Sequence, residues 1–83
     1  MKKRFHTVEK LTDYGARQVL FKKGNKILAW AEEQPNLSWE YALGKKTFKT
    51  WLISQVAKSY QQAETDIIQQ LEDRGEIVKI CNT

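Results

Sequence analysis

The spacing of apolar residues along the chain changes near residue 47. From there on, apolar side chains recur every three or four positions, at Phe48, Leu52, Val56, Tyr60, Ala63, Ile67 and Leu71. Such a stripe is typical of an amphipathic helix that packs one face on a core. Thr47 can cap the start of this helix, and Asp73-Arg74-Gly75 supplies a stop signal. The pattern predicts one long helix over residues 47–74.

Residues 16–33 show strand-like alternation around a tight turn at Gly24-Asn25. Glycine can adopt the positive φ that the first position of a type II′ turn requires, so the segment predicts a β-hairpin. Counting outward from Lys23 and Lys26 pairs Phe21 with Leu28, Val19 with Trp30 and Arg17 with Glu32. This register places the large apolar side chains on one face of the hairpin, and we expect that face to be the core.

A third strand is predicted after the turn at Gln34-Pro35-Asn36. Its apolar positions alternate with small or polar ones, at Leu37, Trp39, Tyr41 and Leu43. The short connection forbids a parallel crossover, so this strand is antiparallel to the second one. The predicted fold class is therefore α+β: a three-stranded antiparallel sheet over residues 16–43, packed against the long C-terminal helix. A fourth short strand is expected at residues 76–81.

The whole chain, residues 1–83, is short enough to form a single domain. Residues 1–14 allow a helical turn, a strand at residues 5–8 or a flexible basic arm. The chain has one cysteine, which excludes an internal disulfide and fits a cytoplasmic protein. It has no apolar run that predicts a signal peptide or a membrane span. We therefore expect no membrane partner.

The second face of the predicted sheet is too apolar for an ordinary solvated surface. It would present Gln18, Leu20, Lys22, Ile27, Ala29, Ala31, Ser38, Glu40 and Ala42. Residues 1–14, a second copy of the protein or a ligand could cover this face.

Basic residues concentrate in the first part of the chain. Residues 1–49 carry 11 Lys/Arg against 5 Asp/Glu, whereas residues 50–83 carry 3 against 5. The candidate nucleic-acid-binding residues are Lys2, Lys3, Arg4, Lys22, Lys23, Lys26, Lys45, Lys46 and Lys49. Contacts from about six such residues to phosphates would give salt-dependent binding without base recognition. Nucleic-acid binding is therefore the expected function, and the alternative is that these lysines are merely solvated.

Two segments resemble parts of known DNA-binding families. Residues 15 to 60 resemble the layout of the AP2 and phage-integrase N-terminal domains, with Leu43-Gly44 leading into Thr47-Phe48-Lys49-Thr50. Those domains place Arg and Trp on the DNA-facing strands, whereas the tryptophans here are expected in the core. The segment from Ile67 to Ile77 is similar to the junction of recognition helix and wing in winged-helix repressors. That family requires a break near Ser59 to Ala63, where this chain has no Gly or Pro.

The sequence gives little support for catalysis. His6 and Cys81 are the only residues of their types and lie at opposite ends of the chain, and Glu32 and Glu33 would point to opposite faces of a strand. No metal-ligand or cofactor motif is present, so we expect neither an enzyme nor a cofactor. The rival to nucleic-acid binding is a small inhibitor or adaptor, of the type that phages and mobile elements encode, which occupies the surface of a partner protein. Homodimerisation through the sheet is a variant of this hypothesis.

Overall fold

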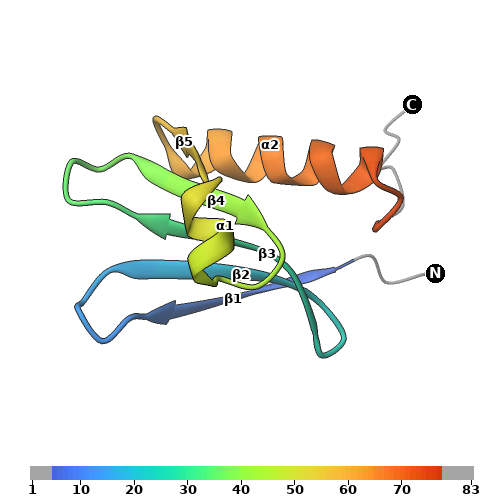
Figure 1. Ribbon diagram of the computed structural model, residues 1–83, viewed down its shortest axis with the longest axis horizontal. Coiled ribbons are helices and arrows are strands. Elements are labelled where there is room, and N and C mark those ends of the chain that lie inside the picture. Colours follow the sequence, from blue (N-terminus) through green and yellow to red (C-terminus); the bar gives the residue numbers. More distant parts are fainter. Residues whose placement is uncertain (1–4, 78–83) are drawn as a thin grey trace.

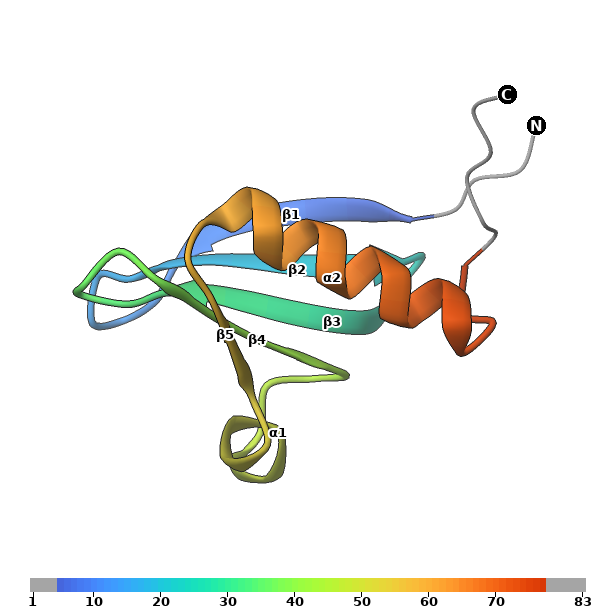
Figure 2. The same cartoon turned by 90° about the horizontal axis from the view of Figure 1, so that it is seen from above.

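The computed structural model describes residues 5–77 and shows an α+β fold (Figure 1). The strands are β1 (His6–Leu11), β2 (Arg17–Lys23), β3 (Lys26–Glu33), β4 (Trp39–Leu43) and β5 (Gln55–Ala57), and the helices are α1 (Phe48–Leu52) and α2 (Tyr60–Asp73). All strand pairs are antiparallel, and the spatial order β1-β2-β3-β4-β5 follows the chain. Seen from above, α1 and α2 lie on opposite sides of β4 (Figure 2).

The prediction of one long helix over residues 47–74 is wrong. The chain leaves the helical path after Leu52, forms β5 beside β4 and begins a second helix at Tyr60. Pairing with β4 gives residues 55–57 the backbone hydrogen bonds that a continuous helix would have given them. The Ser59 side chain then caps α2 by accepting a hydrogen bond from the Gln62 N–H at 3.2 Å. The break divides the apolar stripe into a buried part on α2 and an exposed part on α1 and β5.

The predicted start signal at Thr47 and the predicted stop signal at residues 73–75 are confirmed, although they belong to two different helices. Thr47 Oγ1 accepts a hydrogen bond from the Thr50 N–H at 3.2 Å, and Thr50 Oγ1 accepts one from the Thr47 N–H at 2.8 Å. At the other end, α2 stops at Asp73 and Gly75 adopts a φ of 77°. The residues that make these signals lie within three positions of the helix ends, so a local sequence pattern can predict them.

The β2–β3 hairpin has the predicted turn but a different register. Gly24 has a φ of 63°, and Lys23 pairs with Lys26. The ladder then shifts between Phe21 and Lys22, because Leu28 is an extra residue on β3. The Leu28 carbonyl instead accepts a hydrogen bond from the Gly44 N–H at 2.7 Å.

This bulge overturns the predicted cross-strand pairs. The observed pairs are Phe21 with Ala29, Leu20 with Trp30, Val19 with Ala31 and Gln18 with Glu32. A shift of one residue moves every later side chain to the other face of the sheet. Trp30 and Glu32 therefore lie on the face away from α2, whereas Val19 and Phe21 lie in the α2-side core.

The α2-side core joins the sheet to the helix. Its buried members are Val19, Phe21, Leu28, Ala29, Ala31, Trp39, Tyr41, Ala57, Ala63, Ile67, Leu71 and Ile77. Trp39 and Tyr41 point into this core, as the alternation predicts, but Leu37, the first residue of the predicted strand, is exposed in the β3–β4 turn. The Tyr41 hydroxyl donates a hydrogen bond to Asp66 Oδ2 at 2.7 Å. Burial and the nearby Asp66 carboxylate raise the pKa of Tyr41 to about 12, so the hydroxyl keeps its proton at neutral pH.

The sheet has five strands because both ends of the predicted sheet are extended. Residues 6–11 form β1 along β2, and β5 pairs with β4 at the opposite edge. The predicted strand at residues 76–81 lies mostly outside the described residues, and its described part, Glu76 and Ile77, is not in a strand. Within residues 5–77, no helix is long and apolar enough to cross a membrane.

Candidate functional site

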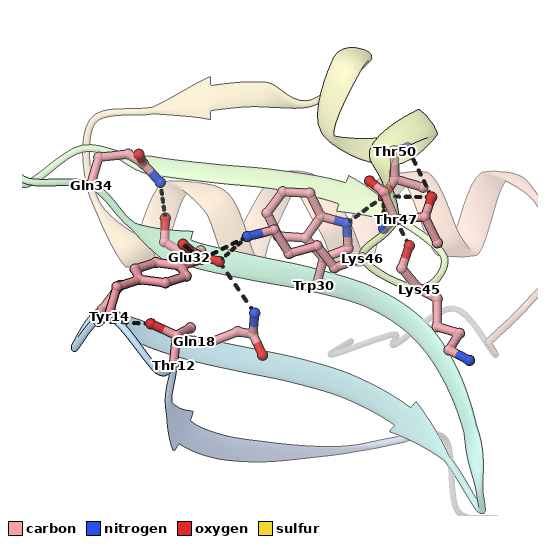
Figure 3. Close-up of polar contacts among 11 residues, drawn as sticks. Thr12, Tyr14, Gln18, Trp30, Glu32, Gln34, Lys45, Lys46, Thr47 and Thr50 are labelled. Carbon is pink, nitrogen blue, oxygen red and sulfur yellow. Dashed lines mark hydrogen bonds and ion pairs between the residues drawn. The ribbon is translucent and has the colours of Figure 1, made fainter.

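A buried carboxylate organises the face of the sheet away from α2. Glu32 is only 5% exposed, and three donors surround it: the Lys46 ammonium, the Tyr14 hydroxyl and the Gln18 amide (Figure 3). Lys46 comes from the segment between β4 and α1, and Tyr14 comes from the β1–β2 turn. The carboxylate thus ties two connecting segments to the middle of the sheet.

The ionised form of Glu32 is the favoured one. Burial by itself would raise the pKa of this carboxyl, but hydrogen bonds from Lys46, Tyr14 and Gln18 and the charge of Lys46 together lower the pKa below its usual value. Burial by itself would lower the pKa of Lys46, but the hydrogen bonds with Glu32 and Tyr14 and the charge of Glu32 together raise it above its usual value. Both groups are therefore charged at neutral pH, and the pair has no net charge.

Trp30 lies beside this ion pair and anchors α1. The ring is fully buried, its Nε1–H donates a hydrogen bond to Thr50 Oγ1 at 3.2 Å, and Lys46 Nζ lies 5.2 Å from the ring centroid. Thr50 Oγ1 also donates to the Lys45 carbonyl at 2.9 Å. The contacts that hold α1 are thus hydrogen bonds between polar groups, and no residue of α1 itself is buried. The helix is therefore held against the sheet with its apolar side chains outward.

Five large apolar side chains are exposed on α1, the turn after it and β5. We call this set the α1–β5 surface: Phe48, Trp51, Leu52, Ile53 and Val56, which are 48% to 71% exposed. The rings of Phe48 and Trp51 are neighbours, with centroids 6.1 Å apart. Val56 lies on β5, the last strand of the sheet, so the surface extends from a short helix to a sheet edge.

The structure places the described candidate nucleic-acid-binding residues in three separate locations. Lys22, Lys23 and Lys26 lie at the β2–β3 turn, and Figure 3 shows the Lys45 side chain extending toward the same end of the sheet. Lys46 does not join them, because it reaches back to Glu32. Lys49 lies on α1. Lys2, Lys3 and Arg4 fall outside the described residues.

The basic cluster at the β2–β3 turn is partly paired. Lys26 Nζ lies 3.5 Å from Glu76 Oε1, and Lys23 Nζ donates to the Glu76 carbonyl at 3.3 Å. A groove of about 350 Å³ runs beside this cluster and is lined by Lys26, Gln55, Gln70 and Arg74 among others. Among the described residues, no three His, Cys, Asp or Glu side chains gather as ligands for a metal ion.

Sequence reasoning missed the α1–β5 surface because it assigned Phe48, Leu52 and Val56 to a buried helical stripe. A signal was present at Trp51-Leu52-Ile53. Three consecutive apolar residues cannot all face one side of a helix, so at least one of them had to be exposed or the helix had to end there.

Comparison with known proteins found no relative of this chain. No protein-family model matches the chain, and no curated protein or solved structure shows significant similarity to it.

Proposed function

We propose that this protein is a non-enzymatic binding module that docks on a partner protein through the α1–β5 surface. The observation that carries the proposal is the outward exposure of five large apolar side chains within residues 48–56. Burying one such side chain is worth about 1.5–3 kcal/mol, so a fold that leaves all five in water gives up a large stabilisation. Apolar groups gathered in this way mark interaction surfaces.

The composition and shape of the surface favour a protein as the partner. Phe48 and Trp51 are exposed aromatic residues on a helix that lies on the other side of β4 from α2, so they can enter a groove of a partner. Aromatic residues, and Trp and Tyr above all, supply a large share of the binding energy at protein interfaces. Leu52, Ile53 and Val56 are aliphatic and cannot form hydrogen bonds or ion pairs with phosphates or base edges.

Serine substitutions at the centre of the surface should abolish binding. We expect Phe48→Ser/Trp51→Ser/Ile53→Ser to weaken the complex at least 100-fold, because two or three interface anchors each contribute about 2 kcal/mol or more. The partner is first captured from a cell lysate on the immobilised protein and identified by mass spectrometry. The affinity of the purified partner for each variant is then measured by calorimetry.

The matched control is Leu11→Ser/Leu37→Ser. These leucines are 67% and 69% exposed, similar to the surface residues, but lie at the end of β1 and in the β3–β4 turn. All variants should keep the wild-type melting temperature, since the replaced side chains are exposed. If the control variant loses the partner equally, or the serine variant keeps it, the proposal is wrong.

Nucleic-acid binding is a second candidate, favoured by the four lysines at one end of the sheet. We expect Lys22→Ala/Lys23→Ala/Lys26→Ala to weaken binding to a random 24-base-pair duplex and to reduce the slope of log K against log salt by about 2–3, because each lost phosphate contact removes about 0.9. Fluorescence anisotropy at several salt concentrations measures this slope. An unchanged affinity would show that these lysines are merely solvated.

A further inference from the structure

We infer that the partner of the α1–β5 surface is an acidic protein rather than a second copy of this chain. This inference rests on the proposed protein-binding function and concerns the chemistry of the partner. Residues 44–59 contain Lys45, Lys46, Lys49 and Lys58 and no Asp or Glu. The segment that carries all five exposed apolar side chains is thus charged with one sign only.

Three of these four lysines are available to a partner. Lys46 is neutralised by Glu32 on the sheet. Lys45, Lys49 and Lys58 are exposed, and within residues 5–77 none of them forms an ion pair. Lys49 lies one residue after Phe48 and three before Leu52, whereas Lys45 and Lys58 lie before α1 and after β5. Along the chain, positive charges therefore lie within and at both ends of the segment that carries the apolar set.

The rest of the neighbourhood offers little compensating charge. Glu40 is the cross-strand partner of Val56 and shares its face of the sheet. The other carboxylate described nearby, Glu32, already binds Lys46. Glu40 alone cannot neutralise Lys45, Lys49 and Lys58. The segment that carries the α1–β5 surface, taken together with Glu40, thus has a net positive charge.

A two-fold dimer through this surface would be electrostatically unfavourable. An isologous interface places the same patch on both sides, so both sides would carry the same excess of positive charge. Like charges placed together across an interface cost several kcal/mol, whereas a partner with an apolar groove and carboxylates around it is complementary. The charge pattern therefore selects a different, acidic chain.

A peptide library tests this inference even while the natural partner is unidentified. The immobilised protein selects binders from a displayed library of random 16-residue peptides, and the enriched peptides are synthesised. We expect them to combine Asp or Glu with aromatic and aliphatic residues. Lys49→Glu should weaken their binding about fivefold, and Lys49→Glu/Lys58→Glu should weaken it further. The matched control Lys10→Glu reverses one charge on β1 and should leave the affinity unchanged.

The other outcomes separate the two proposals. Peptides without acidic residues that are lost in Phe48→Ser/Trp51→Ser/Ile53→Ser but not in Lys49→Glu would overturn the acidic partner and leave protein binding intact. Peptides insensitive to the serine variant, or no enrichment at all, would count against both proposals. A dimer in sedimentation velocity that the serine variant dissociates would identify a second copy as the occupant. Serine-sensitive binding to phosphatidylserine vesicles would identify a membrane surface. Either of these last two results overturns the inference.

Discussion

Replacing Trp30 with alanine should lower the free energy of unfolding by about 3–5 kcal/mol. The ring is fully buried between the sheet and the segment from Lys45 to Thr50, so alanine leaves a large cavity. The substitution also removes the hydrogen bond from Nε1 to Thr50 Oγ1, which is worth about 1 kcal/mol. Because small domains are stable by only about 5–15 kcal/mol, the variant should melt far below the wild type. Urea denaturation followed by circular dichroism measures the difference.

The matched control is Trp30→Phe. Phenylalanine keeps an aromatic ring in the space but cannot donate to Thr50, so we expect a loss of about 1–2 kcal/mol. A loss below about 1 kcal/mol in the alanine variant would contradict the placement of Trp30 in a packed second face. It would also mean that other contacts hold α1 with its apolar side chains outward.

Replacing Lys46 with methionine should destabilise the protein by about 2–3 kcal/mol at pH 7. The substitution keeps most of the aliphatic stem but leaves the Glu32 carboxylate buried without its cation. Removing one partner of a buried ion pair lowers the free energy of unfolding by about 3–5 kcal/mol. We expect a smaller loss here because the Lys46 side chain is 27% exposed. Thermal and urea unfolding at several pH values measure the effect.

The pH dependence gives this prediction its sharpest test. In the wild type the pKa of Glu32 is lowered, so its stabilising contribution is present above the unfolded-state pKa, about 4.3, and is lost as pH falls through the folded-state value. Without Lys46, burial is opposed only by Tyr14 and Gln18, so the pKa of Glu32 should rise. The variant's deficit relative to the wild type should then shrink from pH 7 toward pH 4, because the carboxyl can protonate.

A second substitution separates the charge effect from packing. Glu32→Gln/Lys46→Met has no buried charge, so it should be more stable at pH 7 than Lys46→Met alone, although two residues are changed. Its stability should also vary less between pH 4 and pH 7 than that of the wild type. If Lys46→Met is as stable as the wild type at pH 7, the ion pair does not hold the β4–α1 segment on the sheet.

The candidate site could be predicted only in part. The sequence showed that basic residues concentrate in the N-terminal half, but it did not distinguish Lys46 from its neighbours Lys45 and Lys49. That distinction depends on Glu32, which the bulge at Leu28 turns toward the face where Lys46 passes. A contact between residues 14 positions apart in the chain has no local sequence signal.

The sequence by itself determined the features that neighbouring residues can complete. Gly24 sets the β2–β3 turn, Thr47 and Thr50 cap α1, and Gly75 ends α2. The alternation from Trp39 to Leu43 predicts β4, because alternate side chains of a strand lie on the same face whichever strands are its neighbours.

Only the tertiary structure decided where the helical stripe breaks and which face each β3 side chain takes. The stretch from Ile53 to Lys58 has an apolar spacing that fits a helix, but the free edge of β4 offers it backbone hydrogen bonds, and Ser59 can cap a new helix once that pairing forms. Likewise, the extra residue at Leu28 is stable because Gly44, 16 positions later, donates to its carbonyl. Both choices depend on backbone partners distant in the chain, and a periodic pattern of side chains carries no information about them.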